Sequence, residues 1–396
     1  MDSDTLLNPQ TFDLNDDQKV LLEHADRFAR EQFLPIAEQM DNEEWWPEDL
    51  FRKIGAQGYL GVTIPEEFGG AGLDMVSGGV ILQAFSRYSH AIGLSVLAHD
   101  NLCSNNIARN GNDEQRAKYL PKLNSGEWVG ALGMTEPGAG SDAVGGMATR
   151  AERVGDDYIV NGRKTFITNG PIADVILIYA KTDMKLGSRG ISAFIVEKDM
   201  PGFSVAQKMV KMGFRGSQTG ELLFDNCVVP AENLVGGENA GVAVMMGGLD
   251  IERAMIAPIA IGIGERALQL SIEYAKMREQ FGKPISEFQM IQGKLADMYT
   301  ELEAMRTFVY RALAAAEQVE VGGGGRGEIH KLTASAALFA GESVNRILDN
   351  ALQIHGGFGY MWESEINRLY RSIKLLEIGA GTSEVRRNII AEELLR

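Results

Sequence analysis

The chain has 396 residues, 45% of them hydrophobic, with a formal net charge of −16 at pH 7 and a pI of about 4.9. This length allows about two or three structural units with sizeable cores, and the acidic balance argues against nucleic-acid binding, which requires a basic face. No stretch reaches the roughly 18 apolar residues of a membrane span, and two cysteines, Cys103 and Cys227, are too few for a disulfide framework or a metal cluster.

The first third of the sequence has helical spacing. The opening segment MDSDTLLNPQ has the features of neither a signal peptide nor an Arg-rich transit peptide, so we expect the bacterial cytoplasm or, for a mature eukaryotic chain, the mitochondrial matrix. Asn15, with Gln18 three residues later, predicts a capping box at the start of a helix. The turn PEEFGGAGLD separates this region from a further helix predicted over 77–111. We expect an N-terminal α-helical domain over residues 1–129.

Near residue 130 the pattern changes to short strands. Two β-type runs surround turns at GDD and NG within 148–170, and DVILIYAKT, GISAFIVEKD, GFSVAQKM and ELLFDNCVVP continue at strand length. We predict a middle, mostly antiparallel β domain over residues 130–240.

Helical spacing returns from residue 241 onward. Apolar residues then recur at steps of three and four along one face: Ile291, Leu295, Met298, Leu302, Met305 and Val309. The stretch EVGGGGRGE, residues 320–328, predicts an exposed loop, and a last long helix is expected from near Lys331. GIGERA, residues 262–267, matches a dinucleotide fingerprint but lies within helical sequence, so we interpret it as a helix-packing site. The chain is therefore predicted to be α+β, with a C-terminal four-helix bundle over residues 241–396.

Four stretches have the composition of binding loops. GMTEPGAGSDAVGG (133–146) offers close backbone approach and hydroxyl groups, and KTFITNG (164–170) offers an aromatic ring beside hydrogen-bonding groups. Arg278 and Gln289 flank a Gly-Lys-Pro break, where an arginine suits a pyrophosphate. QIHGGFGY (353–360) and IGAGTSE (378–384) are Gly-rich breaks between helices. None of the five histidines has H-E-x-x-H spacing and no G-x-S-x-G elbow occurs, so zinc and serine-hydrolase chemistry are not expected.

In this order and spacing, the stretches resemble the acyl-CoA dehydrogenase family from end to end. GMTEPGAGSDAVG fits the family's first signature, and QIHGGFGYMWESEINRLYRS fits the second except at Ser372, where an acidic or amide residue is usual. Within the family, NLC, KYLPKL, ITNGP, GISAFIVEKDMPGFS, LD-x-ER, ADMYT and EIGAGTSEVRR most resemble the isovaleryl type. The resemblance implies a helical, a β and a helical-bundle domain, FAD as cofactor, an acyl-CoA substrate, electron-transfer flavoprotein as electron acceptor, and a homotetramer.

The resemblance also assigns binding residues, each by its match to a family motif. The flavin ring is expected against Leu132, Met134, Thr135, Gly140, Ser141, Phe166, Ile167, Thr168, Thr382, Ser383 and Glu384. A neighbouring subunit's FAD pyrophosphate and adenosine are expected to meet Arg278, Gln289, Gln353, Ile354, His355, Gly356 and Gly357. The acyl-CoA is expected to contact Ser141, Ser188, Arg189, Leu94, Ala243, Asp250, Arg253, Ile256, Gly379, Ala380 and Gly381.

The position of the catalytic base is the main departure from most members. The reaction needs a base for the α-proton, which most members carry as the glutamate of a YEGT motif, whereas this chain has GAGT with Ala380 in its place. The isovaleryl type carries the glutamate in LD-x-ER, which here is Glu252. A carboxylate can act as this base if a dry pocket raises its pKa. The alternatives are a helix-start carboxylate or a partner of Arg253, and Glu377 is a nearby competitor expected to point elsewhere.

The resemblance indicates oxidation of isovaleryl-CoA to 3-methylcrotonyl-CoA in leucine catabolism, with the backbone N–H of Ala380 polarising the thioester carbonyl. Ala243 stands where the isovaleryl type tends to carry a tyrosine, so a longer branched substrate such as citronellyl-CoA stays open. Two further alternatives are a non-catalytic acyl-CoA-binding protein of the same fold and an oxidase that reduces oxygen.

Overall fold

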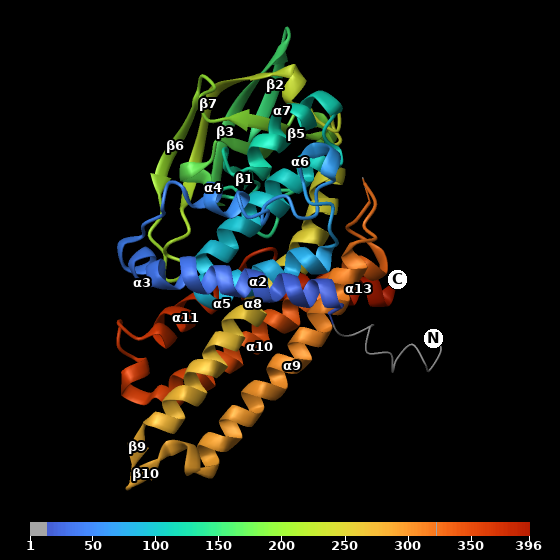
Figure 1. The fold of residues 1–396 in the computed structure, drawn as a ribbon. Helices are drawn as coiled ribbons and strands as arrows, with labels where there is room; N and C mark the ends of the chain where they lie inside the picture. Colours follow the sequence, from blue (N-terminus) through green and yellow to red (C-terminus); the bar gives the residue numbers. More distant parts are fainter. Residues whose placement is uncertain (1–13, 322) are drawn as a thin grey trace.

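The computed structural model describes residues 14–321 and 323–396, so the N-terminal segment MDSDTLLNPQ lies outside the described residues. The β domain lies at one end of the molecule, long N-terminal helices cross its middle, and long C-terminal helices extend to the other end (Figure 1). The predicted fold class is therefore confirmed. Among the described residues, no helix is both long and apolar enough to cross a bilayer.

The N-terminal region consists of helices joined by short turns. They are α2 (Asp16–Gln32), α3 (Leu34–Glu43), α4 (Leu50–Gly55), η2 (Glu66–Phe68), α5 (Met75–Leu97), η3 (Ala98–Ser104), α6 (Asn105–Asn110) and α7 (Asp113–Asn124). The predicted capping box is confirmed, because Asn15 Oδ1 accepts from the Gln18 N–H at 2.8 Å and Gln18 Oε1 accepts from the Asn15 N–H at 3.0 Å. Burial of α5 on nearly all sides makes it the central helix of this region.

The single helix predicted over 77–111 is wrong in one respect. Residues 98–104 form a π-helical segment, η3, between α5 and α6. Tertiary hydrogen bonds hold this wider turn, since His99 Nδ1 accepts from the Gly130 N–H at 2.9 Å and its Nε2 lies 3.0 Å from the Leu123 carbonyl oxygen. Helical periodicity carries no signal for such contacts, and π-helical turns are frequent near functional sites.

The β domain is one eight-stranded sheet. Its strands are β1 (Gly130–Gly133), β2 (Arg150–Val154), β3 (Asp157–Thr168), β4 (Val175–Lys181), β5 (Ile191–Glu197), β6 (Phe203–Lys208), β7 (Thr219–Pro230) and β8 (Leu234–Val235). The order is β6-β7-β3-β2-β4-β5-β8, with β1 paired to β4. The β1–β4 and β2–β4 pairs are parallel and the others antiparallel, as the prediction of a mostly antiparallel unit requires. Short 3-10 turns join the strands: η4 (Gly170–Ile172), η5 (Met184–Gly190) and η6 (Ala231–Asn233).

Long helices form the C-terminal part. The elements are α8 (Gly241–Met277), β9 (Glu279–Gln280), β10 (Lys283–Pro284), η7 (Ile285–Glu287), α9 (Gln289–Ala316), α10 (Gly327–Gly359), α11 (Glu365–Ile373), α12 (Leu375–Ile378) and α13 (Ser383–Leu395). The predicted face of α9 is confirmed, because Met298, Leu302, Met305 and Val309 are buried and Ile291 and Leu295 are partly buried. The last long helix begins at Gly327 rather than near Lys331.

Two predictions about Gly-rich stretches are confirmed. GIGERA lies inside α8, where a Cβ on Gly262 would come within 2.1 Å of the Gln83 carbonyl oxygen of α5, so it is a close helix-packing site. Most described residues of the loop over 320–328 are exposed, although the Gly325 N–H donates to Asp250 Oδ2 on α8 at 2.8 Å. Local composition predicted the loop but carried no signal for its attachment to a distant helix.

Candidate active site

Glu252 lies in α8 and is a buried carboxylate without a close partner. Its relative exposure is 9%, and it makes no side-chain hydrogen bond or ion pair within 4 Å in residues 14–321 and 323–396. Burial raises the pKa of Glu252 to about 7, and Arg253 and Arg386 only partly offset this effect. A carboxyl group with this pKa can accept a proton near neutral pH.

Asp250, two residues earlier, has the opposite environment. It is fully buried, and Oδ1 lies 3.2 Å from Arg253 Nη1 and 2.5 Å from His330 Nδ1. Its second oxygen accepts from the Gly325 N–H. Both carboxylate oxygens of Asp250 therefore have partners within the protein, and its contact with a substrate stays a prediction.

The loop at residues 379–381 lies beside Arg253. A Cβ built on Gly381 would lie 3.9 Å from Arg253 Nη2, and Ala380 has a left-handed backbone with φ +54°. The fully buried Arg386 fixes the start of the loop, since its guanidinium donates to the carbonyl oxygens of Leu376 at 2.8 Å and Gly379 at 2.7 Å. The loop therefore contributes only backbone groups next to the α8 segment that carries Glu252, because none of residues 379–381 has a carboxylate.

The residues around this loop agree with its predicted roles to different degrees. Glu377, the other carboxylate considered for the base, forms an ion pair with Lys374, with Nζ and Oε2 2.5 Å apart. Thr382 is the N-cap of α13 and its hydroxyl accepts from the Val385 N–H at 3.2 Å. Ser383 is buried with a hydroxyl that has no partner among the described residues, and Glu384 is exposed. Their contact with a flavin stays a prediction.

A buried ion pair anchors the predicted flavin loop that follows β1. Lys164 Nζ lies 2.8 Å from Glu136 Oε1 and also donates to the Met134 carbonyl oxygen at 3.2 Å. Glu136 accepts from the N–H groups of Ala148 and Thr149 at 2.6 and 3.0 Å. Burial alone would raise the pKa of Glu136, but the Lys164 ammonium and these donors hold it below its ordinary value. The pair was not predicted, because Glu136 and Lys164 belong to different motifs and nothing in the sequence joins them.

Phe166 presents an aromatic ring to solvent from an unusual backbone. Its φ is +61° and its relative exposure 67%, at the point where the β3–β7 register shifts between Lys164 and Ile167. A bulky side chain in the left-handed region is a strained outlier that often marks a functional position. Ile167 is buried and Thr168 half-buried, so the strand offers an exposed ring beside a partly accessible hydroxyl.

Asn169 connects this strand end to the predicted acyl-pocket wall. Its side-chain amide donates to the carbonyl oxygens of Ser95 at 2.8 Å and Gly130 at 3.1 Å. Ser95 follows Leu94, a predicted wall residue that is buried on α5. The second predicted wall residue, Ile256, is buried on α8 one turn after Glu252. Asn169 was missed as a positioning residue, although its place after a strand and before a glycine is typical of a left-handed turn.

The predicted CoA contacts lie at the surface near the start of α8. Ser188 and Arg189 are exposed in η5, Ala243 is exposed in the first turn of α8, and Ser141 is exposed in the loop after β1. The Lys181 ammonium donates to the Gly145 carbonyl oxygen at 3.4 Å, which ties that loop to the end of β4. These four residues are accessible at the surface, and their contact with CoA stays a prediction.

A second group of predicted cofactor residues lies far from the first. Arg278 and Gln289 flank the β9–β10 hairpin, which is at the end of the bundle away from the β domain (Figure 1). His355 stacks on Tyr274 with ring centroids 4.5 Å apart, so the turn at 353–357 lies beside the same helix end. Within one chain, Arg278, Gln289 and the turn at 353–357 therefore lie far from the loop after β1. This separation is expected if they contact the cofactor of another subunit.

The residues present fit a flavin. Within the loop after β1, a Cβ on Gly138 or Gly140 would meet nothing within 4 Å, so backbone is open to a ligand there. Met134 and Thr135 are half-buried, and the Thr135 carbonyl oxygen accepts from the Thr165 N–H at 2.8 Å, which fixes the loop next to Phe166. In the second group, Gly356 and Gly357 also face open space. An exposed ring, free hydroxyls and bare backbone together suit a large flat heterocycle with a polar edge.

The three-part fold, the flavin-compatible loop and the unpaired Glu252 define a flavoprotein oxidoreductase. Family models for acyl-CoA dehydrogenase match in order: the N-terminal domain over residues 15–127, the middle domain over 131–227 and the C-terminal domain over 239–395. The chain belongs to the acyl-CoA dehydrogenase family, and it is an FAD-dependent acyl-CoA dehydrogenase. The predicted family, enzyme class and cofactor are confirmed.

Known relatives match the chain over nearly its whole length. Mitochondrial isovaleryl-CoA dehydrogenase of Oryza sativa subsp. japonica is 47% identical over 384 residues, which are 96% of this chain and 92% of that protein. Mitochondrial 2-methylacyl-CoA dehydrogenase of Solanum tuberosum is 46% identical over 386 residues, 97% of this chain and 92% of that protein. The structure of butyryl-CoA dehydrogenase from Megasphaera elsdenii matches with a TM-score of 0.93 at 37% identity, covering 97% of this chain and 100% of that one.

Proposed function

We propose that the chain oxidises a short branched acyl-CoA, isovaleryl-CoA in leucine catabolism, to its α,β-unsaturated product with Glu252 as the base. The observation that carries the proposal is the buried, unpaired Glu252 beside a loop whose own acid position is Ala380. Bound FAD would supply the acceptor for the β-hydride. Glu252 would take the α-proton, so the substrate loses one proton and one hydride and gains the Cα=Cβ bond.

The environment of Glu252 suits this role. An ordinary carboxylate is too weak a base for a carbon acid, and desolvation raises its pKa toward the required range. Arg253 is held by Asp250 at 3.2 Å and therefore does not close an ion pair with Glu252. The protein thus keeps a positive charge near the base without neutralising it.

The loop at 379–381 would polarise the substrate carbonyl. The Ala380 N–H donates no hydrogen bond to any residue of the described chain. A fixed amide donor of this kind stabilises negative charge that develops on a thioester oxygen when the α-proton leaves. Because the donor is backbone, replacement of a glutamate by alanine at this position leaves it unchanged.

Support for a branched acyl group comes from the relatives and from the pocket residues. The two mitochondrial relatives are named for isovaleryl-CoA and for 2-methylacyl-CoA, at nearly equal identity. Small residues at 379–381 leave room near the reacting carbons, and Leu94 and Ile256 are buried wall candidates. One methylene changes discrimination by only about 1–3 kcal/mol, so the assignment depends on measurement.

A longer branched substrate such as citronellyl-CoA is the second candidate. The observation that favours it is Ala243, a small exposed residue in the first turn of α8 where the isovaleryl type tends to carry tyrosine. A smaller side chain at the entrance would leave more room along the acyl path. The same enzyme chemistry and the same base would apply.

Electrons would pass from the reduced cofactor to electron-transfer flavoprotein, the acceptor general to the family. We also propose a homotetramer, because the end of the bundle that carries Arg278 and Gln289 exposes large apolar side chains. They are Met277, Phe281 and Met290, at 74%, 93% and 79% exposure. An isolated chain would leave these groups in water, which favours their burial against other subunits.

The test is anaerobic flavin bleaching by a panel of butyryl-, isovaleryl-, 2-methylbutyryl-, citronellyl- and palmitoyl-CoA. We expect isovaleryl-CoA to give the highest kcat/KM. Highest activity with citronellyl-CoA would select the second candidate, and highest activity with palmitoyl-CoA would contradict a branched-chain enzyme. Turnover of the Glu252→Ala variant close to that of the wild type would reassign the base.

A further inference from the structure

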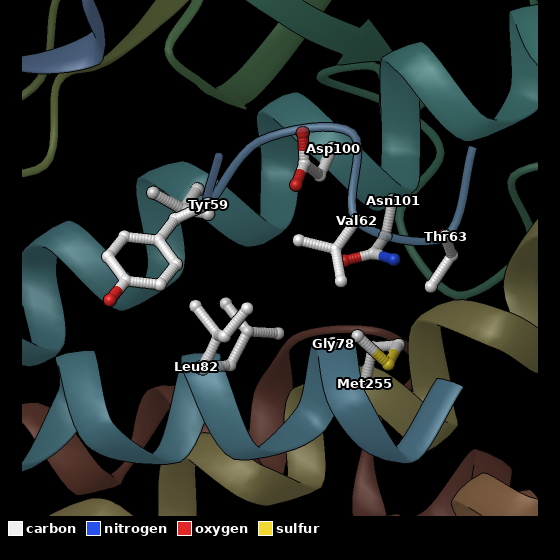
Figure 2. Close-up of a pocket in the computed structure, with 10 residues that line it drawn as sticks. Tyr59, Val62, Thr63, Gly78, Leu82, Asp100, Asn101 and Met255 are labelled. Atoms are coloured by element: carbon white, nitrogen blue, oxygen red, sulfur yellow. The ribbon is translucent and has the colours of Figure 1, made fainter. Parts of the chain in front are cut away.

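A small cavity lies between η3, α5, α8 and the turn at residues 59–63. Its volume is about 10 Å³, and most of its lining is apolar, including Val62, Leu82 and Met255. Figure 2 shows Asp100 and Asn101 on one side, with Gly78 of α5 and Met255 of α8 across from them. Asp100 and Asn101 therefore face a space that Tyr59 and Thr63 also line, with apolar residues around the rest.

These two side chains have unused hydrogen-bonding groups. Asn101 is 4% exposed, and its amide makes no hydrogen bond to any residue in 14–321 or 323–396. Asp100 keeps 13% side-chain exposure; its Oδ1 accepts from the Gly61 N–H at 3.0 Å, and its other oxygen has no partner among those residues. Buried polar groups are nearly always hydrogen-bonded, to protein or to ordered water. A buried amide left without a partner would be costly.

The cavity has the size of one water molecule. A cavity of about 10–15 Å³ holds one water if two or more polar groups can bond to it. We infer that the Asp100 carboxyl group and the Asn101 amide bind a single buried water molecule, which fixes the π-helical segment η3 between α5 and α8. The water would accept from a donor and donate to an acceptor, and both kinds of group are present.

The site connects segments that carry predicted pocket residues. Leu94 precedes η3 by one helical turn, and Met255 is adjacent to Ile256 and three residues after Glu252. The water would therefore hold the acyl-pocket wall at a constant distance from the catalytic helix. This consequence depends on the proposed function, whereas the water site itself does not.

The charged state of Asp100 follows from its surroundings. The other titratable groups facing it are Tyr59 in the turn and His99, whose Nε2 lies 3.8 Å from Asp100 Oδ1. Burial lowers the pKa of His99 to about 4, so it stays neutral and supplies no counter-charge at pH 7. The cavity-lining residues of α5 and α8 are Gly78, Ile81, Leu82 and Met255, none of them titratable. Burial raises the pKa of Asp100 to about 7, opposed by the Gly61 N–H.

The first test fills the cavity with one methyl group. A Cβ on Gly78 would lie 2.9 Å from Met255 Cε and 3.4 Å from Thr63 Cγ2, both groups of the cavity lining. Gly293 is a matched control, because it also lies within a helix and its Cβ would meet nothing within 4 Å. Crystals of the FAD-loaded wild type and Gly293→Ala should show one water within hydrogen-bond distance of Asp100 and Asn101, and Gly78→Ala should lack it.

The thermal midpoints of the same variants give a second readout. Gly→Ala inside a helix normally stabilises, so Gly293→Ala should raise the midpoint. Gly78→Ala should lower it relative to that control, because the new Cβ crowds Met255 Cε at 2.9 Å and the displaced water leaves Asn101 without a partner. A dry cavity in wild-type crystals, or a water retained in Gly78→Ala, would overturn the inference.

The second test uses the proton of Asp100. Its folded-state pKa lies above its unfolded value, so its contribution to stability is present below about pH 4 and is lost as pH rises to about 7. Asp100→Asn stays neutral at every pH and should lose less stability over this range. Glu252 contributes equally to both proteins, and its effect cancels in the comparison. If the free energies of unfolding of the wild type and Asp100→Asn ran parallel with pH, Asp100 would lie in bulk solvent, which would contradict an enclosed site.

The acyl-CoA panel separates this inference from the proposed function. Gly78→Ala should change the ratio of kcat/KM values for isovaleryl- and citronellyl-CoA by several-fold, whereas Gly293→Ala should leave it unchanged. If the wild type reduces its flavin with no acyl-CoA of the panel, the proposed function fails while the crystallographic test still stands. If the water is absent but turnover is normal, only the present inference fails.

Discussion

Glu252 in the C-terminal bundle and Glu136 in the β domain are both buried, yet their carboxyl groups behave in opposite ways. Glu136 has Lys164 at 2.8 Å and two amide donors, and its pKa is lowered. Glu252 has no close partner in the described chain, and its pKa rises to about 7. Burial therefore does not decide the role of a carboxylate. A full set of partners makes Glu136 an anchor, whereas their absence leaves Glu252 able to accept a proton, as the proposed base must.

The largest expected effect comes from removing the unpaired carboxylate. Glu252→Gln keeps shape and burial but cannot accept the α-proton, so flavin reduction by isovaleryl-CoA should slow by about 10²–10⁴-fold. Stopped-flow absorbance of the FAD-loaded variant measures this rate. Glu377→Gln is the matched control, because Glu377 is already paired with Lys374, and it should retain near-normal reduction. Equal losses in both variants would contradict the distinction.

The next effect comes from breaking the anchor. Lys164→Met would leave the Glu136 carboxylate buried without its cation, which typically costs about 3–5 kcal/mol in the free energy of unfolding. We expect a lowered urea midpoint and faster loss of FAD on dilution. Asp49→Asn removes one partner of the exposed Lys53–Asp49 pair at 2.8 Å and should leave the urea midpoint nearly unchanged. A small effect of Lys164→Met would show that the loop after β1 is held by other contacts.

The sequence pointed to the proposed base more readily than to the anchor. Periodicity and turn residues gave the three domains, and the motif LD-x-ER together with the missing acid at Ala380 pointed to Glu252. The Glu136–Lys164 pair, the Arg386 contacts with residues 376–379, and the π-helical turn at His99 were not predicted. Each depends on hydrogen bonds between segments that are distant in sequence or on a backbone shape that residue type does not specify.

The surroundings of Asp250 could not be read from its motif. The family match placed it among substrate contacts, which stays a prediction, and the structure adds Arg253, His330 and the Gly325 N–H as its partners. The loop that supplies Gly325 is largely exposed, as predicted, but its attachment to α8 was not predicted. A motif identifies which residue types recur at a position, but the partners of a side chain come from tertiary packing.

The pH dependence sharpens the comparison between the two glutamates. The folded-state pKa of Glu252 lies above its unfolded value, so its contribution to stability is present below about pH 4.5 and is lost as pH rises through about 7. Glu252→Gln should therefore be more stable than the wild type at pH 8, by at most on the order of 3 kcal/mol, with the difference vanishing near pH 4. Urea unfolding across this range measures the difference. Wild-type kcat/KM should rise over the same interval, because only ionised Glu252 accepts a proton.

The smallest expected effect compares two residues with left-handed backbones, Phe166 and Asn169, with φ of +61° and +63°. Phe166→Gly removes an exposed ring and relieves the strain, so the FAD-free protein should gain about 1 kcal/mol in the free energy of unfolding. The same variant should bind FAD more weakly, because the ring that faces the cofactor position is lost.

Asn169→Gly relieves similar strain but loses the bonds to Ser95 and Gly130, and it should destabilise the fold. Urea titration of both FAD-free variants measures their stability, and flavin fluorescence measures their affinity for FAD. Together they distinguish a ring that serves ligand binding, at Phe166, from a side chain that stabilises the fold, at Asn169. If Phe166→Gly were as destabilising as Asn169→Gly, the exposed ring would serve packing rather than the flavin.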